Sequence, residues 1–164
     1  MNFPPNGSPD ADYEDIKGSF IDKGRTRSVY YVVDSTDYVI KVSTNPQTNK
    51  IESEYYNAAF NSGLDNVTGC LGKIISISKT ATYLIMEHLS DVGNISASVE
   101  IPTEISDVKP ENFGIDKAGK IKLRDYDTQN STNPTGDTRP FVFQTEVVNA
   151  MQSDLDFLND LENE

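Results

Sequence analysis

An α+β fold with an antiparallel sheet is predicted from two observations on the first half of the sequence. Short runs of β-branched and aromatic residues recur there at five places, and turn residues separate most of them. One helical pattern lies between the third run and the fourth. We therefore expect five strands and one helix, followed by a smaller second part.

The five predicted strands share alternating apolar residues and flanking turn signals. The second reads SVYYVVD and the third reads DYVIKVS, which are compositions typical of strands. Because short turns join the first three, these are expected to form an antiparallel meander. The predicted strands span residues 16–23, 28–34, 37–43, 72–78 and 81–87.

The predicted helix has recognisable ends. Asn45 is a suitable N-cap, and Pro46 suits the first helical position. Ile51 and Tyr55 are four residues apart and share one face, and Gly63 is a natural stop. The segment is therefore expected to form one helix between the third and fourth strands.

The remaining segments carry weaker signals. Residues 1–15 are rich in Pro, Gly, Asn and Asp, and we expect a disordered arm there. Residues 16–89 are expected to form a first lobe and residues 90–164 a strongly reduced second lobe. Within the second lobe, residues 90–104 leave room for one short helix, and residues 128–140 read as loop or disorder.

The C-terminal segment 145–162 has an apolar stripe at helical spacing and an acidic remainder, so a terminal acidic helix is predicted. Two interpretations of its charge stay open. The acidic residues form a solvated helix face, or they form a surface for a basic partner or a mimic of nucleic-acid charge.

Composition limits the classes of function. The chain has 164 residues, which suits one domain, and a formal net charge of −12, which disfavours direct binding to nucleic acid. No apolar run approaches the ~20 residues of a membrane helix, and the N-terminus lacks the features of a secretory signal. Cys70 is the single cysteine. We expect a cytoplasmic protein that does not bind membranes.

The segment DVKPEN, from Asp107 to Asn112, carries the most specific chemical signal. It resembles the catalytic loop of serine/threonine protein kinases, in which an Asp is followed five positions later by an Asn. The resemblance implies that Asp107 orients the attacking hydroxyl and that Asn112 holds Mg²⁺. It also implies that Lys109 offsets charge near the γ-phosphate of ATP. A protein kinase-like fold with ATP and Mg²⁺ as cofactors is therefore expected.

Three further parts stand in the family's order. Lys41 ends a VIK run that resembles the V-A-I-K strand, whose Lys binds the α- and β-phosphates. Glu52 is the expected helix partner of Lys41, because Tyr55 and Tyr56 follow it at the spacing of the apolar pair after the family's helix Glu. Glu54 is the competing candidate, and only one of the two can face inward, since residues two apart point to different sides of a helix. Asp125 takes the place of the metal-binding Asp of the D-F-G motif.

The glycine-rich loop of the family is only partly present. With Val29 at the family's Val position, Gly24 occupies the middle Gly position, and Asp22 and Arg27 occupy the other two. The resemblance still implies nucleotide contacts from Gly24 and Val29. Arg25 or Arg27 is a candidate for direct contact with phosphate.

The strand that ends at Glu87 resembles the strand that enters the kinase hinge. By this resemblance Met86 occupies the gatekeeper position. The backbone of Glu87 and Leu89 is then expected to contact adenine.

The resemblance covers about residues 16–127 and breaks at three points. Ile105-Ser106 stands where the family has His-Arg, so control by a phosphorylated activation loop is not expected. Asp127 replaces the Gly of D-F-G. With 39 residues after Asp125, we expect the A-P-E segment and most of the helical lobe to be absent. Small kinase-like proteins of phages and bacteria have this form.

Two functions follow from the resemblance. The first is an ATP-dependent phosphotransferase that modifies Ser or Thr hydroxyls of a protein, which includes the chain itself. The second is a pseudokinase-like module that docks on a host or partner protein without catalysis. A small-molecule kinase of the aminoglycoside or choline type is a third, less similar case. A homodimer is one way to cover apolar surface that a reduced lobe exposes.

Overall fold

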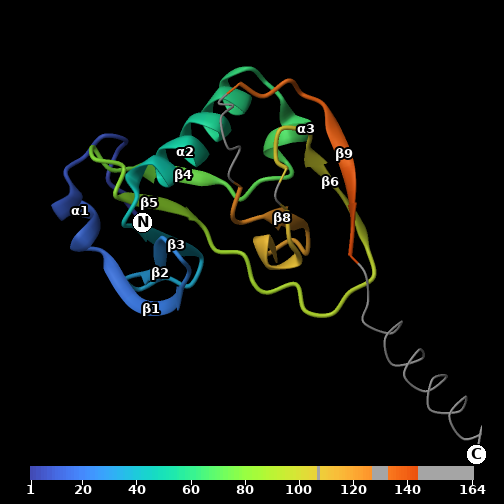
Figure 1. Ribbon diagram of the computed structural model, residues 1–164. Coiled ribbons are helices and arrows are strands. Elements are labelled where there is room, and N and C mark those ends of the chain that lie inside the picture. Colours follow the sequence, from blue (N-terminus) through green and yellow to red (C-terminus); the bar gives the residue numbers. More distant parts are fainter. Residues whose placement is uncertain (107, 127–132, 144–164) are drawn as a thin grey trace, which may run out of the picture.

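The computed structural model describes residues 1–106, 108–126 and 133–143 (Figure 1). The predicted acidic helix 145–162, Asp107 and Asp127 lie outside these residues. The described chain is α+β, as predicted, with a five-stranded antiparallel sheet and few helices. Among the helices described, none has the length and apolarity needed to cross a membrane.

The five predicted strands of the main sheet are confirmed, with ends that differ from the prediction by at most two residues. Neighbouring strands are antiparallel in the order β1-β2-β3-β5-β4, so β3 lies at the centre. The strands are β1 (Lys17–Lys23), β2 (Arg27–Val32), β3 (Tyr38–Ser43), β4 (Ile74–Ile77) and β5 (Tyr83–Glu87).

The predicted helix is α2 (Pro46–Asn61), and it packs on β3, β4 and β5. The side-chain oxygen of Asn45 accepts a hydrogen bond from the Gln47 backbone N–H at 3.3 Å, as expected of an N-cap. At the other end Gly63 has a φ of 67°, a conformation that glycine adopts without steric cost. Both end signals in the sequence were therefore correct.

Side chains of β3 alternate between the two faces of the sheet. Val39 packs in the core on the α2 side, and Lys41 points to the same side. Ile40 packs in a separate cluster on the opposite face. This alternation follows from the two-residue period of a strand, and it leaves the second face apolar and in need of a cover.

The N-terminal segment supplies that cover. It contains α1 (Asp10–Glu14), and Tyr13 is fully buried against Ile40 and Ile85. Phe3 makes an edge-to-face contact with Tyr38, with 4.7 Å between ring centroids. The prediction of a disordered arm over residues 1–15 is therefore wrong, because few but well-placed aromatic residues tie the segment to the sheet.

The second part of the chain is built from short elements. β6 pairs with β9, and β7 pairs with β8, both antiparallel. Two predictions for this part are wrong. Residues 90–104 contain the strand β6 and not a short helix, and residues 138–140 of the predicted loop belong to the strand β9. Local patterns missed both strands because each pairs with a segment about 40 residues away in the sequence. These elements are α3 (Asp65–Thr68), β6 (Ser98–Pro102), the 3₁₀ helix Pro110–Asn112, β7 (Phe113–Ile115), β8 (Ile121–Leu123) and β9 (Thr138–Val142).

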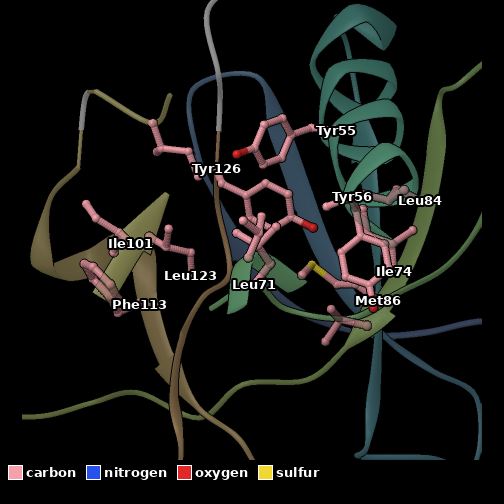
Figure 2. Close-up of a cluster of buried hydrophobic side chains, with 14 of the residues drawn as sticks. Tyr55, Tyr56, Leu71, Ile74, Leu84, Met86, Ile101, Phe113, Leu123 and Tyr126 are labelled. Atoms are coloured by element: carbon pink, nitrogen blue, oxygen red, sulfur yellow. The ribbon is translucent and has the colours of Figure 1, made fainter. Parts of the chain in front are cut away.

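One apolar core joins the sheet, α2 and the second part (Figure 2). The backbone of Leu123 bonds on both sides to the segment before β4, through Gly72 N–H at 2.7 Å and Cys70 C=O at 2.8 Å. Tyr126, directly after β8, is fully buried, and its hydroxyl donates to the Gly72 carbonyl at 3.0 Å. The end of β8 is thereby held beneath α2.

Candidate functional site

A buried ion pair links the centre of the sheet to α2. The Nζ atom of Lys41 on β3 lies 3.3 Å from the Oε2 atom of Glu52, and the two residues are 5% and 0% exposed. Glu54 instead forms an exposed pair with Lys50, four residues earlier on the helix. The choice between the two glutamates that the sequence left open is settled for Glu52, whose position on α2 faces the sheet.

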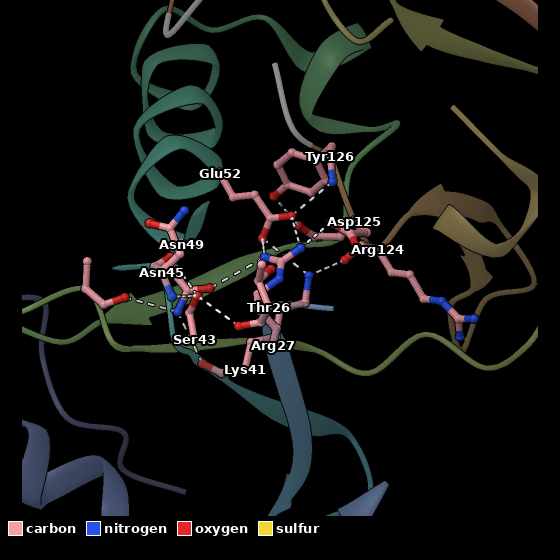
Figure 3. A network of polar contacts seen from close by, with 12 residues as sticks. Thr26, Arg27, Lys41, Ser43, Asn45, Asn49, Glu52, Arg124, Asp125 and Tyr126 are labelled. Atoms are coloured by element: carbon pink, nitrogen blue, oxygen red, sulfur yellow. Dashed lines mark hydrogen bonds and ion pairs between the residues drawn. The ribbon is translucent and has the colours of Figure 1, made fainter. Parts of the chain in front are cut away.

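Arg27 lies at the centre of the same cluster (Figure 3). Its Nη1 donates to Glu52 Oε2 at 2.6 Å and its Nη2 to Glu52 Oε1 at 3.0 Å. The Nη2 group also forms a close ion pair with Asp125. Arg27 is 8% exposed, so one buried guanidinium joins β2, α2 and the segment after β8.

The segment after β8 completes the cluster through its backbone. Lys41 Nζ donates a hydrogen bond to the Arg124 carbonyl. The Tyr126 backbone N–H donates to Glu52 Oε1 at 2.9 Å. Glu52 therefore accepts hydrogen bonds from Arg27, Lys41 and Tyr126, which offsets the cost of burying its carboxylate.

The mutual charges set the protonation of the cluster. Burial, and then the nearby Arg27 charge, lower the pKa of Lys41. Burial alone would favour the neutral acid at Asp125, but the charges of Lys41 and Arg27 hold its pKa below the usual value. Burial opposes the charge of Arg27, yet Glu52 and Asp125 outweigh it and raise the guanidinium pKa. The cluster thus sets two basic side chains, Arg27 and Lys41, against two carboxyl groups, Glu52 and Asp125.

Asn49 is a buried member of the cluster that the sequence analysis missed. It is 0% exposed, and its Nδ2 group donates to the carbonyls of Thr82 at 2.9 Å and Ala81 at 3.0 Å. Its Oδ1 atom lies 3.5 Å from Arg27 Nη1. The sequence did carry a signal for Asn49, because it lies three residues before Glu52 and therefore on the same face of the helix.

The position of Arg27 also had a signal in the sequence. By its place in the sequence, at the position of a family glycine, Arg27 is a candidate phosphate contact. Residues two apart on a strand share a face, so Arg27 lies on the face of Val29, and Val29 is paired with Lys41 in the β2–β3 register. The local pattern could not show the carboxylates that Arg27 meets, since Asp125 is 98 residues away in sequence.

The candidate metal ligands lie at the edge of this cluster. The Asn112 carbonyl accepts hydrogen bonds from the backbone N–H groups of Arg124 at 2.7 Å and Asp125 at 3.3 Å. The Asn112 side-chain oxygen accepts from the Lys109 N–H at 2.7 Å, and the Lys109 side chain is exposed. No group of three or more His, Cys, Asp or Glu side chains in the described residues is arranged to hold a metal ion.

The donor chemistry of Asn112 and Asp125 nevertheless suits Mg²⁺, which takes carboxylate and amide oxygens and keeps several waters. In the described arrangement both side chains have other partners. Asp125 is paired with Arg27, and the Asn112 oxygen closes a turn with Lys109. Arg27 would therefore compete with the ion for the charge of the Asp125 carboxylate.

The expected nucleotide-contact residues lie on neighbouring elements. Met86 is 1% exposed and belongs to the core, and Leu89 is 2% exposed and packs close to Gly114. Glu87 is bound by Lys122, with 2.8 Å between Nζ and Oε1. Gly24 closes the β1–β2 turn, where its N–H donates to the Arg27 carbonyl at 2.8 Å.

A surface cavity of about 260 Å³ lies beside the β5 end, between Glu87, His88 and Lys117. Lys41, Glu52 and Asp125 do not line it. The cavity and the charged cluster therefore share no lining residue.

The site is thus a four-charge cluster in which Arg27, Lys41 and Glu52 are buried and Asp125 is half exposed, with Asn112 bonded to its edge. Its chemistry suits the binding of an anion by the cations or of a metal by the carboxylates, provided that the internal pairs open. Neither a family model nor a curated protein matches the sequence.

Proposed function

We propose that the chain is a protein kinase-like phosphotransferase that transfers the γ-phosphate of ATP to Ser or Thr hydroxyls of a protein, itself included. The observation that carries the proposal is the buried pair of Lys41 and Glu52, with the Asp125 segment bonded to both residues. A lysine fixed by a helix glutamate beside an aspartate is the arrangement that phosphoryl transfer by a kinase uses.

Each residue has a role in this proposal. Lys41, positioned by Glu52, binds the α- and β-phosphates, and Met86, Glu87 and Leu89 lie along the adenine side. Asn112 and Asp125 hold Mg²⁺, which would neutralise charge on the phosphates. Gly24 and Val29 cover the nucleotide from the β1–β2 hairpin.

The reaction balances as a simple transfer. The substrate hydroxyl oxygen forms a bond to the γ-phosphorus while the bond from that phosphorus to the β–γ bridging oxygen breaks, and ADP leaves with the electron pair. Asp107, assigned from the sequence alone, orients the hydroxyl and accepts its proton. Lys109 offsets the negative charge on the transferred group.

A second function is favoured by the contacts of Arg27. Because its guanidinium already neutralises Glu52 and Asp125, the cluster is satisfied without nucleotide or metal. A chain that kept this state permanently would be a pseudokinase-like module, which docks on a host or partner protein and modulates it without catalysis.

The two functions are separated by incubating purified protein with labelled ATP, Mg²⁺ and a generic protein substrate, beside Asp107→Asn and Asp125→Asn variants. Asp91→Asn is the matched control, since Asp91 is 85% exposed and pairs only at the surface with Arg124. Transfer that is kept in Asp91→Asn and lost in the other two supports the phosphotransferase.

A melting experiment on the same samples gives the opposing outcome. At a nucleotide concentration about 100 times the Kd, binding adds about 2.7 kcal/mol of apparent stability. Absence of both transfer and a melting shift with ATP and Mg²⁺ would contradict the phosphotransferase and favour the docking module.

A further inference from the structure

Arg27 and Asp125 form the contact that decides whether the charged cluster is open. Arg27 Nη2 is shared between the Asp125 carboxylate and Glu52 Oε1, while Nη1 is held by Glu52 Oε2. Loss of the Asp125 contact alone leaves both bonds from Arg27 to Glu52 intact. The contact can therefore open without moving β2 or α2.

The two partners differ in their freedom to move. The Arg27 side chain is 8% exposed and Glu52 is 0% exposed, so this bidentate pair is enclosed. The Asp125 side chain is 49% exposed. Asp125 is consequently the partner that can rotate toward solvent, and Arg27 is the fixed one.

We propose that Arg27 is a built-in competitor of Mg²⁺ for the Asp125 carboxylate, so that the free protein is latched and binding of metal and nucleotide releases Asp125. This inference rests on the proposed function and concerns the regulation of the same site. Arg27 supplies the positive charge that the carboxylate needs while no metal is bound.

The latch has a direct consequence for metal dependence. Mg²⁺ must replace one charge-assisted contact, so nucleotide binding requires more Mg²⁺ than it would without the guanidinium fork. A lysine at this position keeps the charge but offers a single ammonium in place of the fork, and so it cannot hold Glu52 and Asp125 in the same way. Arg27→Lys is therefore expected to lower the Mg²⁺ requirement.

The test measures binding of a non-hydrolysable ATP analogue by calorimetry over a series of Mg²⁺ concentrations. Wild-type protein is compared with Arg27→Lys and with Lys23→Arg, which makes the reverse exchange at an exposed position of the same hairpin. We expect the half-saturating Mg²⁺ concentration to fall about tenfold in Arg27→Lys, or about 1.4 kcal/mol, and to stay unchanged in Lys23→Arg.

A second measurement needs no variant to fold. In protein with isotope-labelled arginine, the Arg27 guanidinium protons should exchange slowly in the free state, and their resonances should shift when Mg²⁺ and the analogue are added together. Saturable binding with no change in these resonances would overturn the latch.

The outcomes separate the two proposals. If wild-type protein and Arg27→Lys bind the analogue with the same Mg²⁺ requirement, the latch fails and the phosphotransferase stands. If neither protein binds the analogue at any Mg²⁺ concentration, the proposed function fails, and the latch fails with it.

Discussion

The guanidinium of Arg27 and the carboxylate of Glu52 form a bidentate pair, with 2.6 Å between Nη1 and Oε2 and 3.0 Å between Nη2 and Oε1. Lys41 Nζ approaches the Oε2 atom of the same carboxylate at 3.3 Å. Glu52 therefore balances two buried cations, and its charge is the point on which the cluster depends.

Replacement of Glu52 by Gln is expected to destabilise the protein by about 3–5 kcal/mol, because it leaves the buried charges of Arg27 and Lys41 without their shared partner. Urea unfolding followed by circular dichroism measures the change. Glu54→Gln is the matched control on the same helix, and its exposed pair with Lys50 predicts a change within about 0.5 kcal/mol. Equal effects of the two variants would contradict the central place of Glu52.

Asn49→Ala should destabilise the protein by about 1–3 kcal/mol, because the carbonyls of Ala81 and Thr82 lose their common donor inside the protein. Asn61→Ala, an exposed change at the end of the same helix, serves as the control. Chemical denaturation of both variants provides the comparison. A cost at Asn49 no larger than at Asn61 would show that water replaces these hydrogen bonds.

The N-terminal segment is expected to contribute to global stability through Tyr13. Removal of this fully buried ring in Tyr13→Ala should cost about 3–5 kcal/mol. Tyr13→Phe removes only the hydroxyl, which donates to the Pro5 carbonyl at 3.3 Å, and should cost about 1 kcal/mol or less. Equilibrium unfolding tests both variants, and a negligible effect of Tyr13→Ala would mean that residues 1–15 fold independently of the sheet.

A pH dependence is expected from Tyr83. Its hydroxyl donates to Glu14 at 2.7 Å, and this hydrogen bond, with burial, raises the pKa of Tyr83 from 10.0 to about 12. Since the folded state holds this proton more tightly than the unfolded state, the contribution is complete below pH 10 and is lost as the pH rises through about 12.

An ultraviolet absorbance titration of wild-type protein and Tyr83→Phe isolates this ionisation. Stability curves of the two proteins should converge as the pH rises from about 10 to about 12. A stability difference that stays constant over this range would contradict the role of the Tyr83–Glu14 hydrogen bond.

Within residues 16–88, local patterns determined the five strands and α2, but not the short helix α3. The strands followed from two-residue alternation, and the ends of α2 followed from Asn45, Pro46 and Gly63, since each of these signals acts within a few residues. The pairing of Lys41 with Glu52 was instead predicted from the resemblance to protein kinases, and the two side chains do meet, at 3.3 Å. The phosphotransferase function, with its ATP and Mg²⁺, stays a prediction.

The tertiary structure decided what local patterns do not contain. Tyr13 covers a sheet face whose residues lie far along the chain, and β6 finds its partner in β9 only after folding. Most of all, it decided the role of Arg27, whose partners Glu52 and Asp125 are 25 and 98 residues away. A buried guanidinium must be paired, but which carboxylates pair with it depends on how distant segments pack, and no short stretch of sequence specifies that.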